Sequence, residues 1–150
     1  MIFREAKTTD IPQIQIVRHT VKENVLSNPA LVTDKDCEDY LIIRGKGWVC
    51  EIEQEIVGFA IADLIANNVW ALFLNPEHEG KGIGKKLHDT MLNWYFSQTK
   101  ETLWLGTEFN TRAEKFYRLQ GWTEAGLNGS DEIRFEMSYD AWRQQKMDKV

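Results

Sequence analysis

The chain has 150 residues, 43% of them hydrophobic, which is the usual size of one domain with one core. Its formal net charge is -5 at pH 7, so it lacks the basic face that binding to nucleic acid requires. No apolar run is long enough to span a membrane, and no signal-peptide pattern is present. Cys37 and Cys50 are too few for a disulfide framework or a zinc site. We therefore expect a single cytoplasmic domain over residues 1–150 with two free thiols and no metal.

The first third of the chain predicts a strand and two helices. Residues 2–6 are predicted to form the strand. Apolar residues at helical spacing, with Pro12 near the start, predict a helix to about Asn24. Thr33-Asp34-Lys35-Asp36 resembles a capping box with Asp in the place of Glu or Gln, which predicts a second helix to about Arg44. Residues 45–47, with two glycines, are expected to end that helix.

Three β-rich runs follow, at residues 48–53, 56–64 and 68–74. The connections between them are only a few residues long. Short connections favour antiparallel neighbours, so these runs predict an antiparallel meander.

A proline turn and a glycine-rich loop come directly after the third of these runs. Gly80, Gly82 and Gly84 allow a ligand to approach the backbone closely, because glycine has no Cβ. The loop leads into a predicted helix that ends at about Gln98, and a helix start favours anions, phosphate above all. We therefore predict a phosphate-bearing ligand here. A Rossmann site fits badly, because the spacing is G-x-G-x-G and the preceding strands are antiparallel.

The last third predicts a strand at residues 102–107, a helix at 111–120 closed by Gly121, a hairpin pair at 122–126 and 133–138, and a C-terminal helix. Asn128-Gly129 is expected in the hairpin turn. Thr111-x-x-Glu114 forms a capping box, which leaves the side chain of Asn110 outside the helix and available to a ligand. The order βααβββαβαββ predicts a mixed α/β (α+β) sheet.

In this element order and in two motifs, the chain resembles the GNAT superfamily of acetyl-CoA-dependent N-acetyltransferases. One motif is the loop Glu79-Gly80-Lys81-Gly82-Ile83-Gly84, preceded by Asn75-Pro76. The other is the pattern N-x-x-A-x-x-F-Y-x-x-x-G-W at residues 110–122. The resemblance covers nearly the whole chain and implies the GNAT fold, with a central sheet that splays between its fourth and fifth strands. The chain departs from the family at Glu79, where the usual residue is Gln or Arg.

The resemblance implies that acetyl-CoA is the cosubstrate. Its pantetheine arm would enter where the fourth and fifth strands splay and pair with the backbone of Leu72 and Leu74, and Asn110 would contact the same arm. The pyrophosphate would lie against the loop, which comprises Glu79, Gly80, Lys81, Gly82, Ile83, Gly84 and Lys85. Glu79 brings a negative charge there, and the charges of Lys81, Lys85 and Lys86 can offset it.

For the chemistry, the resemblance singles out Tyr117 as the general acid. An amine attacks the thioester, and a well-placed phenol can protonate the thiolate that leaves. A backbone N–H near Leu74 would stabilise the oxyanion. The alternative is that Tyr117 is a buried aromatic residue with a satisfied hydroxyl. The general base stays open. The fourth strand offers no carboxylate, and Asp63, Glu108 and Glu23 each fit a solvated carboxylate as well as a base.

The acceptor is expected to be a primary amine of a small molecule or peptide. In the family, acceptor contacts come from the first two helices and the strand ends, which implicates Arg18, His19, Glu23, Asn24, Val25 and Trp70. His19, His78 and His88 show no metal-ligand spacing, and we expect His88 on a helix surface. Two alternatives stay open: a CoA-binding sensor or interaction domain without catalysis, and a donor such as succinyl-CoA. Neither nucleic acid nor membrane is an expected partner, and a homodimer stays open.

Overall fold

Seven strands and five α-helices follow one another along residues 1–21 and 32–148, the part of the chain that the computed structural model describes. Their order confirms the predicted mixed α/β arrangement, including the predicted C-terminal helix. The contacts within the chain divide it into two units, Met1–Tyr95 and Phe96–Val150.

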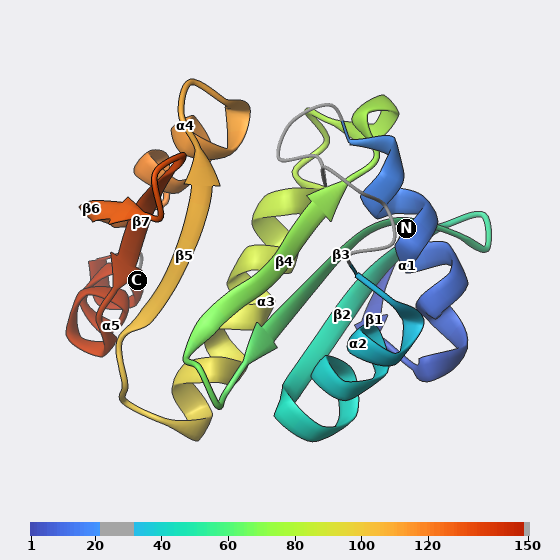
Figure 1. The fold of residues 1–150 in the computed structure, drawn as a ribbon, viewed down its shortest axis with the longest axis horizontal. Helices are drawn as coiled ribbons and strands as arrows, with labels where there is room; N and C mark the ends of the chain where they lie inside the picture. The colour runs from blue at the N-terminus through green and yellow to red at the C-terminus, as the bar shows by residue number, and fades with distance from the viewer. Residues whose placement is uncertain (22–31, 149–150) are drawn as a thin grey trace. The chain divides into compact units, whose positions relative to one another are not determined.

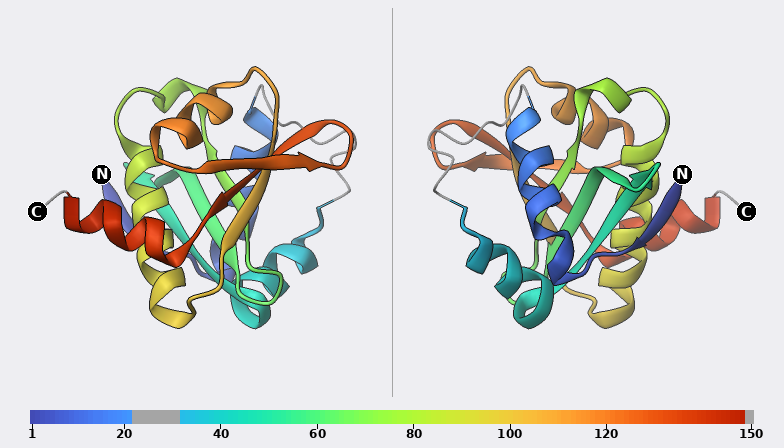
Figure 2. Two further views of the ribbon diagram at one scale, coloured as in Figure 1. Left: turned by 90° about the vertical axis from the view of Figure 1, so that its left-hand side faces the viewer. Right: turned by 90° about the vertical axis from the view of Figure 1, so that its right-hand side faces the viewer.

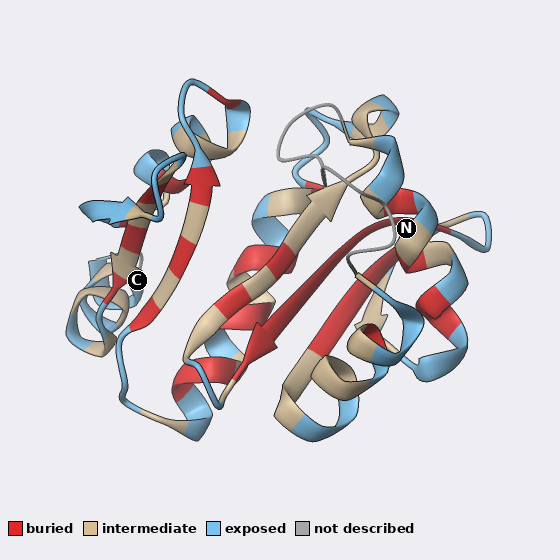
Figure 3. Ribbon diagram, viewed as in Figure 1, coloured by how far each residue is buried: buried red, intermediate tan, exposed pale blue. Residues whose placement is uncertain are grey.

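The first unit contains an antiparallel sheet in the order β1-β2-β3-β4, as the short connections predict. Glu53 and Gln54, between β2 and β3, both have positive φ, as expected for a tight hairpin turn. β3 is buried along nearly its whole length (Figure 3), so it forms the centre of this unit. The strands are β1 Ile2–Glu5, β2 Gly45–Ile52, β3 Glu55–Asp63 and β4 Asn68–Leu74.

Helices cover both faces of this sheet (Figures 1 and 2). α1 Ile11–Thr20 and α2 Asp34–Asp39 lie on one face, and α3 Ile83–Gln98 lies on the other. α1 packs on the sheet through Ile14 and Val17, which join the buried cluster of Val49, Ile56, Phe59, Ile61 and Ala71. This packing holds α1 against β3 and β4.

The first helix ends earlier than predicted, whereas the second reaches the predicted Arg44 through a π-helical turn. α1 ends at Thr20, and Val21 is extended with φ -68° and ψ 149°. The Thr20 hydroxyl donates to the Val17 carbonyl at 2.7 Å, a local bond that competes with the helical ladder. The rest of the predicted helix, to Asn24, lies outside the described residues. α2 begins with the predicted capping box of Thr33 and Asp36, and a π-helical turn, Tyr40–Arg44, continues it.

The second helix ends before Gly45, as predicted, but Gly45 and Gly47 already lie in β2, which begins earlier than the predicted strand at residues 48–53. A Cβ at Gly47 would approach Leu41 Cδ2 to 2.5 Å and Ile61 Cγ1 to 3.0 Å. A Cβ at Gly45 would collide with the Ala62 carbonyl of β3. Close packing on the neighbouring strand and helix, and not a turn, explains both glycines.

β4 carries one more residue than its partner strand at one point. Ile61 pairs with Ala71 and Ala62 pairs with Val69, so within these described strands Trp70 has no partner in β3. A bulge of this kind reverses the alternation of side chains between the two faces of a sheet. Trp70 and Phe73, three residues apart, therefore contact the same side chain of α1.

The second unit is a three-stranded antiparallel sheet in the order β5-β7-β6. Gly129, with φ +64°, lies in the hairpin turn as predicted, whereas Asn128 still pairs with Glu132 at the end of β6. The C-terminal helix is held by Trp142, whose ring stacks on Phe96 at 5.0 Å. The elements are β5 Leu103–Glu108, α4 Arg112–Leu119, β6 Thr123–Asn128, β7 Glu132–Met137 and α5 Tyr139–Asp148.

Candidate active site

The loop between β4 and α3 has the backbone that its glycines predict. The Asn75 side chain accepts a hydrogen bond from the Glu77 N–H at 3.0 Å and starts a single 3₁₀ turn, Pro76–His78. Gly80 and Gly82 have φ of +78° and +80°, a conformation that favours glycine. The Lys86 N–H donates to the Gly82 carbonyl at 3.2 Å, which sets the start of α3 at Ile83.

The same loop leaves space in front of its backbone. A Cβ added at Gly80, Gly82 or Gly84 would meet no atom of the described residues within 4 Å. Ile83 and Gly84, in the first turn of α3, carry N–H groups that no carbonyl of the helix can accept from. An open helix start with these donors is suited to the pyrophosphate of a nucleotide.

The lysines around the loop have partners of their own. Lys81 Nζ lies 3.1 Å from His78 Nδ1, within the loop. Lys85 pairs with Asp89 at 2.8 Å, and Lys86 Nζ lies 5.2 Å from the centre of the Phe3 ring. The charge of Lys85 is therefore shared with a carboxylate, and Lys81 is the lysine closest in the chain to Glu79.

His88 does not lie on the helix surface as predicted, because it is 3% exposed. Its Nδ1 is 2.9 Å from Asp89 Oδ1. Burial opposes ionisation of Asp89, but the hydrogen bonds from His88 and Lys85 outweigh it and lower the pKa of that carboxyl to about 2. His88 thus belongs to the packing of α3 near its start.

Tyr117 of α4 is buried among aromatic rings of the second unit. Its ring meets Trp122 edge-on at 5.5 Å, Phe116 edge-on at 5.3 Å and Phe135 at 6.2 Å. Burial raises the pKa of the Tyr117 hydroxyl above its ordinary value. The phenol keeps its proton at neutral pH, as an ordinary tyrosine also does.

Asn110 lies outside α4, as the sequence predicts, with Thr111 as the N-cap. Thr111 Oγ1 accepts from the Glu114 N–H at 3.2 Å. The Glu114 carboxylate accepts from the Asn110 N–H at 2.8 Å, one residue earlier than in the predicted box. This bond accompanies a left-handed backbone at Asn110, with φ +60°, and leaves its side chain exposed.

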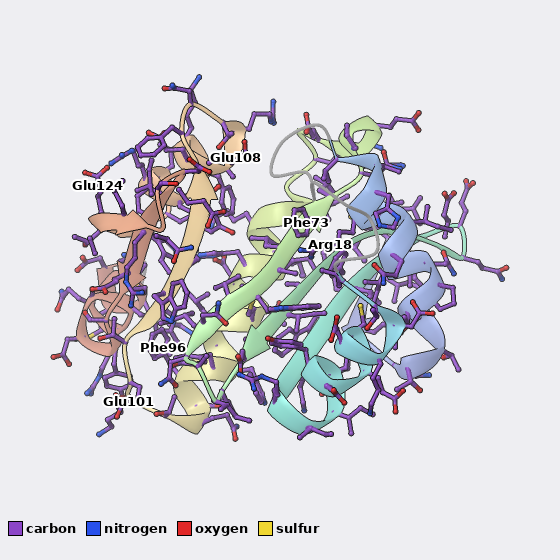
Figure 4. The ribbon with its side chains drawn as sticks, viewed as in Figure 1. Arg18, Phe73, Phe96, Glu101, Glu108 and Glu124 are labelled. Carbon is purple, nitrogen blue, oxygen red and sulfur yellow. The ribbon has the colours of Figure 1, made fainter. Side chains whose placement is uncertain are left out.

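The three carboxylates considered as general base have different surroundings. Asp63 accepts from Arg44 Nη2 at 2.7 Å and, through its other oxygen, from the N–H groups of Ile65 at 2.8 Å and Ala66 at 3.3 Å. Both carboxylate oxygens of Asp63 therefore accept hydrogen bonds that stabilise the fold. Glu108 is exposed at the end of β5 (Figure 4), and Glu23 lies outside the described residues.

Of the predicted acceptor residues, the structure describes Arg18, His19 and Trp70, whereas Glu23, Asn24 and Val25 lie outside the described residues. Trp70 stacks on Tyr40 with a centroid distance of 4.0 Å and an interplanar angle of 11°. No motif in the sequence marked Tyr40 as a neighbour of Trp70. Leu72 and Leu74 lie in the same strand and are half-buried, in register with Ala60 and Gly58 of β3.

Two features are absent from the described residues, a metal-binding cluster and a membrane-spanning helix. No set of three or more His, Cys, Asp or Glu side chains is arranged to bind a metal ion. No helix combines the length and the apolar character needed to cross a membrane. Cys37 and Cys50 are unpaired and buried, which agrees with the predicted free thiols.

Comparison with known sequences identifies the family. The sequence profile of the acetyltransferase (GNAT) family matches residues 16–122. The chain belongs to this family. A curated relative, an uncharacterised N-acetyltransferase of Archaeoglobus fulgidus, is 32% identical over 124 residues, which are 71% of this chain and 84% of the relative. The chain is therefore a GNAT acyltransferase, as the two motifs predicted.

Solved GNAT structures share the fold. The PaiA N-acetyltransferase of Thermoplasma acidophilum, in complex with coenzyme A, matches with a TM-score of 0.80 and 16% identity over 92% of this chain and 98% of that one. The ribosomal-protein-alanine N-acetyltransferase of Brucella melitensis matches with a TM-score of 0.74 and 21% identity, over 92% of this chain and 99% of that one. A putative streptothricin acetyltransferase of Bacillus anthracis, in complex with acetyl coenzyme A, matches with a TM-score of 0.69 and 18% identity, over 91% of this chain and 98% of that one. These likenesses confirm the predicted fold class.

Proposed function

We propose that this enzyme transfers an acetyl group from acetyl-CoA to a primary amine of a small molecule or peptide. The observation that carries the proposal is the open glycine loop at the start of α3, where Gly80, Gly82 and Gly84 leave their backbone uncovered by the described residues. Two of the structural relatives named above are complexes with coenzyme A or acetyl coenzyme A, which supports this choice of donor.

In this proposal the backbone of the first unit binds the donor. The N–H groups of the loop and of the first turn of α3 would bind the pyrophosphate, because that end of a helix favours negative charge. The backbone of Leu72 and Leu74 would pair with the amides of the pantetheine arm. The exposed side chain of Asn110 would contact the same arm, as the resemblance to the family implies.

The reaction then proceeds by direct attack. The amine nitrogen forms a bond to the acetyl carbonyl carbon, and the tetrahedral intermediate expels the sulfur of CoA. Tyr117 donates its hydroxyl proton to that sulfur, and the proton that the amine nitrogen releases ends the cycle by restoring the phenol through solvent. The Tyr117 phenol is protonated at neutral pH, as an ordinary tyrosine also is, and the rise in its pKa on burial makes it a weaker acid.

Calorimetric titration with acetyl-CoA, followed in the same samples by CoA release with a pooled amine library, tests the proposal. Binding with amine-dependent release supports the transferase and names the acceptor class. Binding without release across a broad library favours the alternative of a CoA-binding sensor. Absence of binding contradicts the proposed donor and implicates the negative charge of Glu79.

A further inference from the structure

The guanidinium of Arg18, on α1, lies against two aromatic rings of β4 in the first unit. Its Cζ is 4.7 Å from the centre of the Phe73 ring and 5.4 Å from that of Trp70. Figure 4 shows Arg18 beside Phe73. The bulge at Trp70 brings both rings to this face, and Tyr40, stacked on Trp70, extends the aromatic wall.

Arg18 is a partly buried arginine that pairs with no carboxylate of the described residues. Its Nε and Nη1 atoms are buried and make no hydrogen bond, and none of the ion pairs found among the described residues includes it. By contrast, carboxylates pair with Arg4, Arg44, Arg118 and Arg134. The positive charge of Arg18 is therefore left without a counter-ion in the described structure.

The neighbouring thiol does not supply that counter-ion. Among the described residues, Cys37 is the ionisable group whose charge would act on Arg18, and burial raises the pKa of Cys37 to about 11. Cys37 is therefore neutral at physiological pH. Desolvation also lowers the pKa of Arg18, which shows that its surroundings disfavour the bare charge.

The position of the guanidinium against the two rings determines which groups can accept hydrogen bonds from Arg18. Aromatic rings attract a guanidinium through its flat face and leave the N–H groups at its edge without acceptors. Those N–H groups form a planar fork that matches the two oxygens of a carboxylate. Phe73 lies between Leu72 and Leu74, the residues that the proposed function assigns to the donor, so an anion on Arg18 would be next to the donor strand.

We propose that Arg18 binds a carboxylate of the substrate, and that this enzyme therefore prefers a carboxylate-bearing substrate. The inference rests on the proposed function for its setting. The carboxylate has two sources in a transfer reaction: the acceptor amine, as in an amino acid or a peptide C-terminus, or the acyl group of a donor such as succinyl-CoA. Both present the same two oxygens to the fork, and the experiment separates them.

The first arm compares acceptors with acetyl-CoA as donor. Amino acids and short peptides are paired with their C-terminal amides, and kcat/KM is measured for wild type, Arg18→Gln and Arg18→Lys. If the carboxylate is on the acceptor, Arg18→Gln lowers kcat/KM for the acids by roughly 10- to 100-fold, the usual effect of losing a charge-assisted pair. The value of kcat/KM for the amides changes much less. Arg143→Gln, an exposed arginine on α5, is the matched control and leaves the acid-to-amide ratio unchanged.

The second arm compares succinyl-CoA with butyryl-CoA, using benzylamine as an acceptor without a carboxylate. A wild-type preference for succinyl-CoA that Arg18→Gln abolishes assigns the carboxylate to the acyl group. Equal losses for acids and amides, together with equal losses for both donors, show that Arg18 only stabilises the fold and overturn the proposal. Arg18→Lys keeps the charge without the fork, so it gives the same test if Arg18→Gln does not fold.

A third arm does not depend on catalysis. N-acetyl amino acids and N-acetyl amino acid amides have no reactive amine, so their binding is measured by calorimetry whether or not any transfer occurs. Tighter binding of the acids by wild type, lost in Arg18→Gln, supports a carboxylate site even if the proposed function fails. If acids and amides bind alike and succinyl-CoA shows no preference, the carboxylate site is refuted while the transferase proposal can still stand.

Discussion

Tyr117 is the residue on which the proposed chemistry depends most. We expect Tyr117→Phe to lower kcat by roughly 100-fold or more, because a positioned general acid contributes that much, and to leave the Kd of acetyl-CoA nearly unchanged. Steady-state kinetics and calorimetry measure the two quantities. The matched control is Tyr139→Phe, which removes the hydroxyl of a half-buried tyrosine in the same unit. Equal kcat in Tyr117→Phe and wild type would leave Tyr117 with a packing role only.

Asp63 is predicted to stabilise the fold and to have no role as the base. Asp63→Asn removes the charge that pairs with Arg44, so we expect Tm to fall by several degrees. The acid limb of the kcat/KM profile against pH should stay where it is in wild type. A limb that disappears in Asp63→Asn would instead identify Asp63 as the general base.

Single residues were predicted from the sequence where a local motif marks them. The glycine loop, Asn110 outside its helix and Thr111 as the N-cap are all set by neighbours within four positions in the chain. The isolation of Arg18, the pairing of Asp63 with Arg44 and the burial of His88 depend on which distant segments meet. No local pattern contains that information.

At the scale of elements, the start of α3 gives the sharpest test of donor binding. Gly84→Ala should stabilise the helix by up to about 1 kcal/mol, because alanine favours helix and no described atom obstructs its methyl group. The same methyl group should weaken acetyl-CoA binding about tenfold or more, if the donor lies against this backbone. Chemical denaturation and calorimetry give the two values.

Gly126→Ala is the matched control for this change. Gly126, in β6, also has open space around its Cβ position among the described residues, but its φ is +88°. The substitution should cost about 1 kcal/mol of stability and leave acetyl-CoA affinity unchanged. A Gly84→Ala protein that is more stable and binds acetyl-CoA as well as wild type would contradict the proposed position of the pyrophosphate.

The elements themselves follow closely from sequence periodicity and capping. β4 has the predicted bounds, and α3 ends at the predicted Gln98. The short connections correctly predicted that β2, β3 and β4 are antiparallel neighbours. The errors arise where tertiary packing decides the conformation. Gly45 and Gly47 are needed for close contact within the sheet, and the extra residue in β4 depends on its pairing with β3, which one strand's sequence does not encode.

At the scale of the whole molecule, buried thiols link stability to pH. Burial raises the pKa of Cys37 from its ordinary 9.0 to about 11. A raised folded-state pKa stabilises the protein below the unfolded value, and this contribution is lost as pH rises through the folded value. We therefore expect the free energy of unfolding to fall as pH rises from about 9 to 11, measured by urea titration.

Cys37→Ala tests this origin of the alkaline loss. The variant should lose less stability than wild type over the same pH interval, although its stability at pH 7 is lowered by the smaller side chain. An identical slope in the two proteins would assign the loss to other groups, such as Tyr117, whose pKa burial also raises.

The bulge in β4 has a consequence for how such an enzyme can be altered. Trp70 contributes no pair to the β3 ladder, so a change of side chain there does not disturb the strand pairing on either side. The residues proposed to bind the donor, by contrast, would act through their backbone. Position 70, together with position 18 facing it, is therefore a natural target for a directed-evolution library, in which new substrates could be selected on a scaffold whose donor-binding strand stays intact.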